Sequence, residues 1–284
     1  MIVDKKTLNC KGRLLWIEDP VIMGILNITP DSFYSESRVM LPQQALDKAL
    51  SMINDGASII DIGGASSRPG AQEVSEQEEM DRVLPIIETI SKVIPDSILS
   101  IDTYRSSVAK AAVNSGASIV NDISAGRIDE NMYPAIAEME VPYILMHMQG
   151  NPQSMQKNPT YQNVTLEVLD FFIEELGKLR ALNVKDVILD PGFGFGKMTS
   201  HNYELMNGLH TFRFLECIVL AGISRKSMIH KALNIAPEES LNGTTALHMK
   251  ALMEGAKILR VHDVKPAVEV INLYKLLEKH QPES

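Results

Sequence analysis

The stretch "DGASIIDIGG", residues 55–64, is the clearest guide to the fold. Gly-Ala follows a helical pattern, a short β-branched run comes next, and the run ends at Asp61. Glycine is typical of the end of a helix, and a short continuous apolar run is typical of a strand buried in a parallel sheet. The same order recurs in "SGASIVNDIS" at 115–124 and in "EGAKILRVHD" at 254–263. The repeat therefore predicts helix and strand units that alternate along the chain.

Further apolar runs have the length of buried strands, and they lie at 21–27, 97–102, 142–147, 186–190 and 217–222. Helical patterns alternate with the strands, at 42–55, 76–93, 105–115, 131–139, 163–182, 202–215, 239–254 and 264–280. Eight such units in 284 residues predict an α/β fold, a (β/α)8 TIM barrel. A doubly wound open sheet is the alternative, but it usually has a glycine-rich turn after the first strand. Residues 7–16 predict a short N-terminal β-hairpin that closes the bottom of the barrel.

The composition limits the class of protein. The net charge of −9 disfavours a nucleic-acid partner or an anionic membrane surface. No apolar run approaches the roughly 18 residues of a membrane helix, and the first residues have no apolar segment of a signal peptide. Cys10 and Cys217 are far apart, which suits two buried thiols in a reducing cytoplasm. There is no linker, so we expect residues 1–284 to form one domain in the cytoplasm.

Polar residues end most of the predicted strands. They are Asn27, Asp61, Asp102, Asn121, His147, Asp190, Gly222 with the following "SRK", and Arg260 with His262. A single polar residue at such a place could be a helix N-cap. In a (β/α)8 barrel, however, the active site is built at the carboxyl ends of the strands. The whole set therefore predicts a ligand site there.

The chemistry of this set suggests a flat heterocycle. Buried Asp102 and Asp190 need hydrogen-bond donors, and a 2-amino-pyrimidinone edge, as in pterins and guanine, offers two parallel N–H groups. Asn121 can donate to and accept from the same ring, and Lys226 can donate to a ring oxygen or nitrogen. Met146 is expected to pack on the ring face, with Asp61 behind the first contacts.

The end of the last strand suits an anion. Arg260 and His262 are two residues apart, so they point the same way if the strand continues. Asn27 is expected opposite them. Phosphate sites after the seventh and eighth strands are common in this architecture. We therefore expect an anionic group at the rim of the heterocycle site.

The segment "DPGFGFGK", residues 190–197, matches neither the P-loop nor the dinucleotide fingerprint. We interpret it as a loop that lines the heterocycle, with glycines that let the backbone pass close to a flat ligand and with Phe195 as a wall. Lys197 is expected to face solvent, and His147 to give structural support. Surface positions are expected for the remaining helical and loop histidines, His201, His210, His230, His248 and His280.

The chain resembles the dihydropteroate synthases in a set of segments that lie in that family's order. They are "MGILNITPDSF" (23–33), "IIDIGGASSRPGA" (59–71), "IVNDIS" (119–124), "LMHMQGNPQSMQ" (145–156), "LDPGFGFGK" (189–197), "GISRKSMI" (222–229) and "RVHD" (260–263). The resemblance spans about residues 20–265 and includes seven motifs in register, which makes it specific.

The resemblance implies the reaction. Family members condense 6-hydroxymethyl-7,8-dihydropterin diphosphate with 4-aminobenzoate to 7,8-dihydropteroate and diphosphate, in folate biosynthesis. Asp102, Asp190, Lys226 and Arg68 would be catalytic, and Asn27 would bind Mg²⁺. The pterin diphosphate would contact Ser67, Asp102, Asn121, Met146, Asp190, Phe195, Gly222, Lys226, Arg260 and His262. The 4-aminobenzoate would contact Phe33, Arg68, Pro69 and Ser227.

The resemblance also implies small-molecule substrates and a homodimer packed through late helices, here 239–254 and 264–280. Loops 28–40 and 63–75 are expected to close over the site. The chain departs from the family in both loops, with Ser35 beside Glu36 where Asp is expected, and with Ala65 and Ser67 where Glu and Thr are usual. The alternatives are a pterin methyltransferase of the related barrel family and a non-catalytic pterin-binding protein.

Overall fold

The computed structural model describes residues 7–28, 41–65, 74–150, 155 and 158–280. Parallel strands form a closed barrel in which the last strand pairs with the first, in the order β10-β3-β4-β5-β6-β7-β8-β9. Their bounds are β3 (Val21–Asn27), β4 (Ile59–Gly63), β5 (Ile98–Asp102), β6 (Ile119–Asp122), β7 (Tyr143–Met146), β8 (Val187–Asp190), β9 (Ile218–Ala221) and β10 (Ile258–Val261). The predicted (β/α)8 barrel is confirmed.

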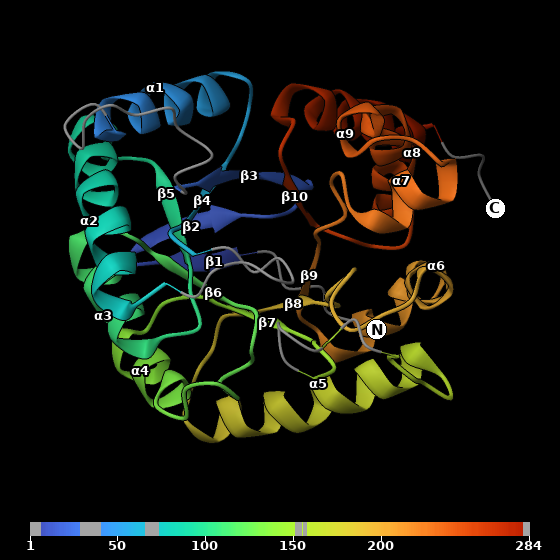
Figure 1. Cartoon of the computed structure of the whole chain (residues 1–284), viewed down its shortest axis with the longest axis horizontal. Coiled ribbons are helices and arrows are strands. Elements are labelled where there is room, and N and C mark those ends of the chain that lie inside the picture. Colours follow the sequence, from blue (N-terminus) through green and yellow to red (C-terminus); the bar gives the residue numbers. More distant parts are fainter. Residues whose placement is uncertain (1–6, 29–40, 66–73, 151–154, 156–157, 281–284) are drawn as a thin grey trace.

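The helices surround the strands as an outer ring (Figure 1). They are α1 (Leu41–Asn54), α2 (Glu76–Val93), α3 (Ser106–Ser115), α4 (Met132–Met139), α5 (Val164–Ala181), α6 (Thr199–Asn207), α7 (Ser227–Leu233), α8 (Leu241–Met253) and α9 (Val264–Lys279). Side-chain caps begin two of them: the Ser75 hydroxyl accepts from the Glu78 N–H before α2, and the Asn163 amide oxygen accepts from the Leu166 N–H before α5. Such caps satisfy N–H groups that the helix leaves unpaired.

The predicted helix over 202–215 was wrong in its bounds. The chain forms α6 and then a separate 3-10 helix, η1 (Leu209–Leu215). The break falls at Gly208, where a Cβ atom would lie 2.5 Å from the Thr165 hydroxyl at the start of α5. Glycine also weakens a helix by about 1 kcal/mol relative to alanine. The short helix α7 and a 3-10 turn, η2 (Pro237–Glu239), were not predicted.

The interior of the barrel is apolar at the amino ends of the strands. One buried cluster there, called the base below, contains Met23, Ile59, Ile119, Ile144, Ile188, Ile218, Leu220 and Ile258 from the strands, with Leu8, Cys10 and Ile17. Leu8 and Cys10 belong to β1 (Thr7–Cys10), which pairs antiparallel with β2 (Arg13–Trp16). The predicted hairpin is therefore confirmed, and its side chains close this end of the barrel. No helix within the described ranges is both long and apolar enough to cross a membrane.

Candidate active site

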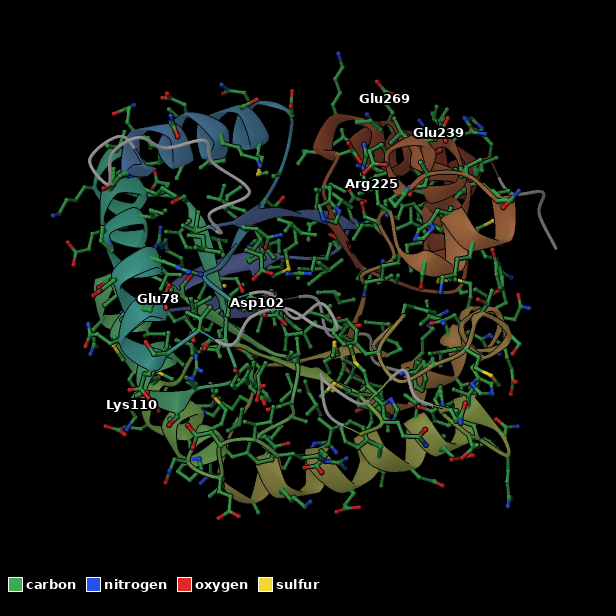
Figure 2. All side chains as sticks on the ribbon, viewed as in Figure 1. Glu78, Asp102, Lys110, Arg225, Glu239 and Glu269 are labelled. Atoms are coloured by element: carbon green, nitrogen blue, oxygen red, sulfur yellow. The ribbon has the colours of Figure 1, made fainter. Side chains whose placement is uncertain are left out.

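The carboxyl ends of β3–β10, called the mouth below, hold the polar residues that the strand pattern predicts. Side chains of a strand alternate between its two faces, so a step of two residues stays on the inner face. That step leads from the base to the mouth as Ile59 to Asp61, Ile119 to Asn121, Ile144 to Met146, Ile188 to Asp190, Leu220 to Gly222 and Ile258 to Arg260. Figure 2 shows Asp102 inside the ring of helices, whereas Glu78 and Lys110 lie on the outer helices.

Arg260 joins two carboxylates in the mouth. Its Nε donates to Asp61 Oδ2 at 2.7 Å, and its Nη2 donates to Asp102 Oδ2 at 2.7 Å. The Asn121 amide also donates to Asp61 Oδ2, at 3.0 Å. Asp61 is fully buried, and a buried charge without donors is costly. Asp61 therefore needs Arg260, and it holds both Arg260 and Asn121 in place from deeper in the barrel.

Asp190 and Lys226 meet on the opposite side of the mouth, beside Gly222. A Cβ atom on Gly222 would lie 3.7 Å from Asp190 Oδ2 and 3.7 Å from Lys226 Nζ. The other oxygen, Asp190 Oδ1, accepts from the Gly192 N–H at 2.8 Å. Lys226 Nζ donates to the Phe193 carbonyl at 2.6 Å and lies 4.6 Å from the centre of the Phe195 ring. The carboxylate, the ammonium and the aromatic ring thus share one small region.

Burial shapes the charges of the mouth. It raises the pKa of Asp190, against the lowering effect of Lys226, and it raises the pKa of Asp102, against the lowering effect of Arg260. Burial lowers the pKa of Lys226 to about 8 and that of His262 to about 4. His262 is therefore neutral near pH 7. Any ligand that brings N–H donors into the mouth would therefore stabilise the ionised form of the two carboxylates.

Asn27 provides a candidate metal ligand at the end of β3. Its Oδ1 lies 3.6 Å from the position of a Cβ atom on Gly63, and Asp102 Oδ2 lies 3.7 Å from the same position. Among the described residues, no cluster of three or more His, Cys, Asp or Glu could hold a metal ion. One amide oxygen beside a carboxylate suits Mg²⁺, which keeps several waters and binds largely through substrate phosphates.

Comparisons with known proteins bear on this mouth. The family model described as "Pterin binding enzyme" matches residues 23–262. A curated dihydropteroate synthase of Escherichia coli (strain K12) is 44% identical, over 93% of this chain and 93% of its own length. The chain belongs to the dihydropteroate synthase family. The predicted family and the predicted enzyme class, a transferase, are thereby confirmed.

Solved structures of this family share the fold closely. The Yersinia pestis dihydropteroate synthase in complex with a sulfonamide drug matches with a TM-score of 0.90 at 40% identity, covering 96% of this chain and 99% of its own. The Xanthomonas albilineans dihydropteroate synthase with 4-aminobenzoic acid matches with a TM-score of 0.89 at 37% identity, covering 98% of this chain and 99% of its own.

Several residues assigned from the family resemblance lie outside the described residues: Phe33, Ser67, Arg68 and Pro69, together with Ser35 and Glu36. Ser227 begins α7 directly after Lys226. Met146 and Phe195 belong to one apolar cluster with Tyr104, Ile123, Met148 and Met155. The Ser224 hydroxyl accepts from the His262 N–H at 3.2 Å and lies 3.1 Å from His262 Nδ1. Ser224 belongs to the predicted "SRK" segment after Gly222, but its contact with His262 was not predicted.

The prediction that Lys197 faces solvent was wrong. Its side chain is buried, and its Nζ lies 2.9 Å from His147 Nδ1 and 3.0 Å from the Gly192 carbonyl. Two glycines of the 190–197 loop also lie against neighbouring backbone. A Cβ atom on Gly192 would lie 1.9 Å from the His147 carbonyl oxygen, and one on Gly196 would lie 2.5 Å from that of Gln149. The close approach is therefore to the backbone that follows β7.

Two histidines were wrongly expected at the surface. His201 is buried against the Tyr161 ring, with ring centres 5.0 Å apart, and its Nδ1 accepts from the Met198 N–H. His248 is buried in α8, where burial lowers its pKa to about 4. Both rings occupy the apolar side of a helix, where a neutral imidazole packs as a flat partly apolar group.

A further contact joins the loops after β9 and β10. The guanidinium of Arg225 donates to both carboxylate oxygens of Asp263, at 2.8 Å each, and to the Glu238 carbonyl at 2.8 Å. A bidentate pair of this kind fixes orientation as well as distance. It lies beside Lys226 and His262 in the chain, so it holds two candidate ligand residues in register. The sequence gives no signal for this pair, since 38 residues separate its members.

Proposed function

We propose that the mouth joins 6-hydroxymethyl-7,8-dihydropterin diphosphate to 4-aminobenzoate and releases diphosphate, forming 7,8-dihydropteroate. The observation that carries this assignment is the convergence of two carboxylates, buried Asp190 and partly buried Asp102, with the cations Lys226 and Arg260 at the ends of four different strands. Family membership supports the reaction. The 4-aminobenzoic acid bound to the Xanthomonas relative supports the second substrate.

The pterin would bind deep in the mouth. Asp190 would accept the paired N–H groups of the 2-amino-pyrimidinone edge through Oδ2, which lies near Gly222 and Lys226 Nζ. Asn121 would pair with the same ring by donating and accepting, and Lys226 would donate to a ring atom. The Met146 and Phe195 side chains, which share one apolar cluster, would contact the ring faces.

The diphosphate would lie nearer the rim, against Arg260, His262 and Asn27. A guanidinium has five N–H donors, and two of those of Arg260 reach Asp61 and Asp102 in the described contacts. Arg260 therefore has donors for an anion while it stays oriented by Asp61. Mg²⁺ bound to the Asn27 oxygen would neutralise charge on the leaving diphosphate.

The chain would then assist a substitution at the exocyclic methylene of the pterin. The C–O bond to diphosphate breaks with the electron pair leaving on oxygen, and the methylene carbon becomes positive. Ionised Asp102 and Asp190 stabilise that charge through space. The amino nitrogen of 4-aminobenzoate forms the new C–N bond, and its surplus proton goes to water or diphosphate. The described residues thus bind, orient and stabilise charge, without a strong general base.

The test is a turnover assay with the purified protein, dihydropterin diphosphate, 4-aminobenzoate and Mg²⁺, following dihydropteroate and diphosphate. Product that requires all three additions supports the proposal. Pterin binding without product would favour the non-catalytic pterin-binding protein. Methyl transfer from a methylated pterin, with no diphosphate release, would favour the methyltransferase.

A homodimer through the late helices is part of this proposal. Leu273, Leu276 and Leu277 on α9 are all more than half exposed, at 58%, 54% and 57%. Their spacing of three and four residues puts them on one side of the helix, and a grouped apolar surface of this kind often marks an interface. Leu276→Glu is expected to shift the molar mass in light scattering from dimer to monomer, while exposed Lys92→Glu on α2 leaves it unchanged.

We also propose that residues 1–284 form one domain and that the chain works in the cytoplasm. One closed barrel uses strands from residue 21 to residue 261, and the hairpin packs on its interior. Cys10 is a buried free thiol, which suits a reducing compartment.

A further inference from the structure

Within the described part of the chain, Lys197 is a strongly buried lysine that the reaction described above does not use. Only 3% of it is exposed. Its Nζ lies within hydrogen-bonding distance of three carbonyl oxygens, those of Gly192 (3.0 Å), Phe195 (3.1 Å) and His147 (3.4 Å), and of His147 Nδ1 (2.9 Å). These four acceptors are more than enough to satisfy the three hydrogens of an ammonium group.

Both Lys197 and Lys226 donate to backbone carbonyls of the 190–197 loop. Lys197 Nζ donates to the carbonyls of Gly192 and Phe195, whereas Lys226 Nζ donates to the carbonyl of Phe193, which lies between them in the sequence. The backbone N–H of Gly192 donates to Asp190 Oδ1. The conformation of one short loop therefore fixes Asp190, the Phe195 ring and the partner of Lys226 together.

Other contacts complete the loop without reaching the mouth. The Gly194 N–H donates to the Asn202 amide oxygen at 2.7 Å, and the Tyr161 hydroxyl donates to the Gly196 carbonyl at 2.8 Å. A charged donor contributes more than a neutral one. Lys197, which can carry a charge, can therefore contribute more to holding the loop than either of these neutral contacts.

We propose that Lys197 is a positioning residue for the pterin, which holds the 190–197 loop so that Asp190, Phe195 and Lys226 meet the ring together. The proposal rests on the proposed function, because it assigns these residues to the pterin. Lys197 itself does not touch the substrate. We expect its effect to fall mainly on the pterin, because Asp190 and Phe195 of this loop are assigned to the pterin.

The charge of Lys197 supports the same role. Asp190 is the acidic group that raises the pKa of Lys197, while burial lowers that pKa to about 7. In return, Lys197 is one of the cations that lower the pKa of Asp190, after Lys226, the Gly192 N–H and Arg260. A cation behind the loop therefore favours the ionised carboxylate that the pterin requires.

The test compares Lys197→Met, Lys197→Gln and the wild-type protein in steady-state assays with each substrate varied in turn. Methionine is one atom shorter than lysine, keeps an unbranched apolar chain and has no donors. We expect Lys197→Met to raise KM for dihydropterin diphosphate about tenfold or more, the scale of one lost charged hydrogen bond, and to leave KM for 4-aminobenzoate within about twofold. The exposed Lys92→Met is the matched control and is expected to change neither KM.

Lys197→Gln keeps two donors on a shorter side chain, which cannot reach every carbonyl at once, so its KM for the pterin should fall between those of wild type and Lys197→Met. It also serves as the test if Lys197→Met fails to fold. Unchanged KM values in a folded Lys197→Gln or Lys197→Met, or equal increases for both substrates, would overturn the proposal. Wild-type protein without turnover would instead refute the proposed function, which this design separates from failure of the loop.

Discussion

The two ends of the barrel interior are built from the same strands and have opposite chemistry. At the base, Ile188 and its apolar neighbours pack against the hairpin. Two residues further along β8, Asp190 faces the mouth. The base contributes stability by removing apolar surface from water, and the mouth contributes binding through groups that are costly to bury alone. One strand can therefore contribute both to stability and to binding, because its inward-facing side chains change from apolar to polar over two residues.

The largest effect is expected for Arg260→Ala, a change at the mouth that should reduce both the stability of the protein and its binding of the diphosphate substrate. It leaves Asp61 buried without its strongest donor, which should reduce the free energy of unfolding by about 3–5 kcal/mol. It should also weaken the binding of dihydropterin diphosphate far more than the binding of free 6-hydroxymethyl-7,8-dihydropterin, because only the former carries the anion. Denaturant unfolding and calorimetric titration with both ligands measure the two effects. Equal losses for the two ligands would remove Arg260 from the anion site.

Ile188→Ala tests the base, where we expect a loss of stability with little change in pterin binding. Ile188 is fully buried, and truncation of a buried isoleucine costs about 2–5 kcal/mol through lost burial and the cavity left behind. The pterin KM should change by less than about twofold, because the cavity opens at the base rather than at the mouth. Urea unfolding and steady-state kinetics on the same sample decide the point. A large rise in KM with little loss of stability would mean that the two ends are not separate.

Asp190→Asn is expected to weaken pterin binding while the stability of the protein stays nearly unchanged, the reverse of Ile188→Ala. The amide keeps the shape of the side chain and can still accept from the Gly192 N–H, so the free energy of unfolding should change by less than about 1 kcal/mol. Pterin binding should weaken by about 1.5–3 kcal/mol, the scale of a charged hydrogen bond. Isothermal titration with 6-hydroxymethyl-7,8-dihydropterin measures the loss, with the exposed Asp81→Asn on α2 as control. Unchanged affinity would place the pterin elsewhere.

How far the sequence predicts this molecule depends on the range of the interactions involved. The alternation from Ile59 to Asp61 and from Ile188 to Asp190 is local, so the strands, the barrel and the polar strand ends followed from period and spacing. The position of Lys197 did not, because it depends on a loop that folds back on His147, 50 residues away in the chain. Its partners are backbone carbonyls, which leave no mark in the sequence.

The Asp61–Arg260 pair was missed for a similar reason. Both residues were recognised as strand ends, but their contact spans 199 positions and closes the barrel between β10 and β4 across β3. Strand order in a closed barrel brings the first and last units together, so their proximity was predictable while the particular pairing was not. Sequence alone gives the list of groups at the mouth, and the closed sheet decides which of them neutralise each other.

The smallest of the expected effects is a pH dependence that distinguishes the mouth from the base. Burial lowers the pKa of Lys226 from 10.5 to about 8, against the raising effect of Asp190. The lysine is a cation below that pH and loses its charge as the pH rises through it. The value of kcat/KM for dihydropterin diphosphate should therefore fall by up to about tenfold per pH unit above pH 8. Lys226→Arg keeps the charge, so the fall near pH 8 should disappear even though binding is weaker.

Lys197 is the control for that assignment, because burial lowers its pKa to about 7 and it lies near the same carboxylate. In Lys197→Gln the fall near pH 8 should remain, whereas titration of Lys197 itself would make it vanish. Unfolding measured over the same pH range separates loss of binding from loss of structure. A fall that survives in Lys226→Arg would show that the group titrating near pH 8 is not Lys226, and the ammonium would then have no part in the pH dependence of pterin binding.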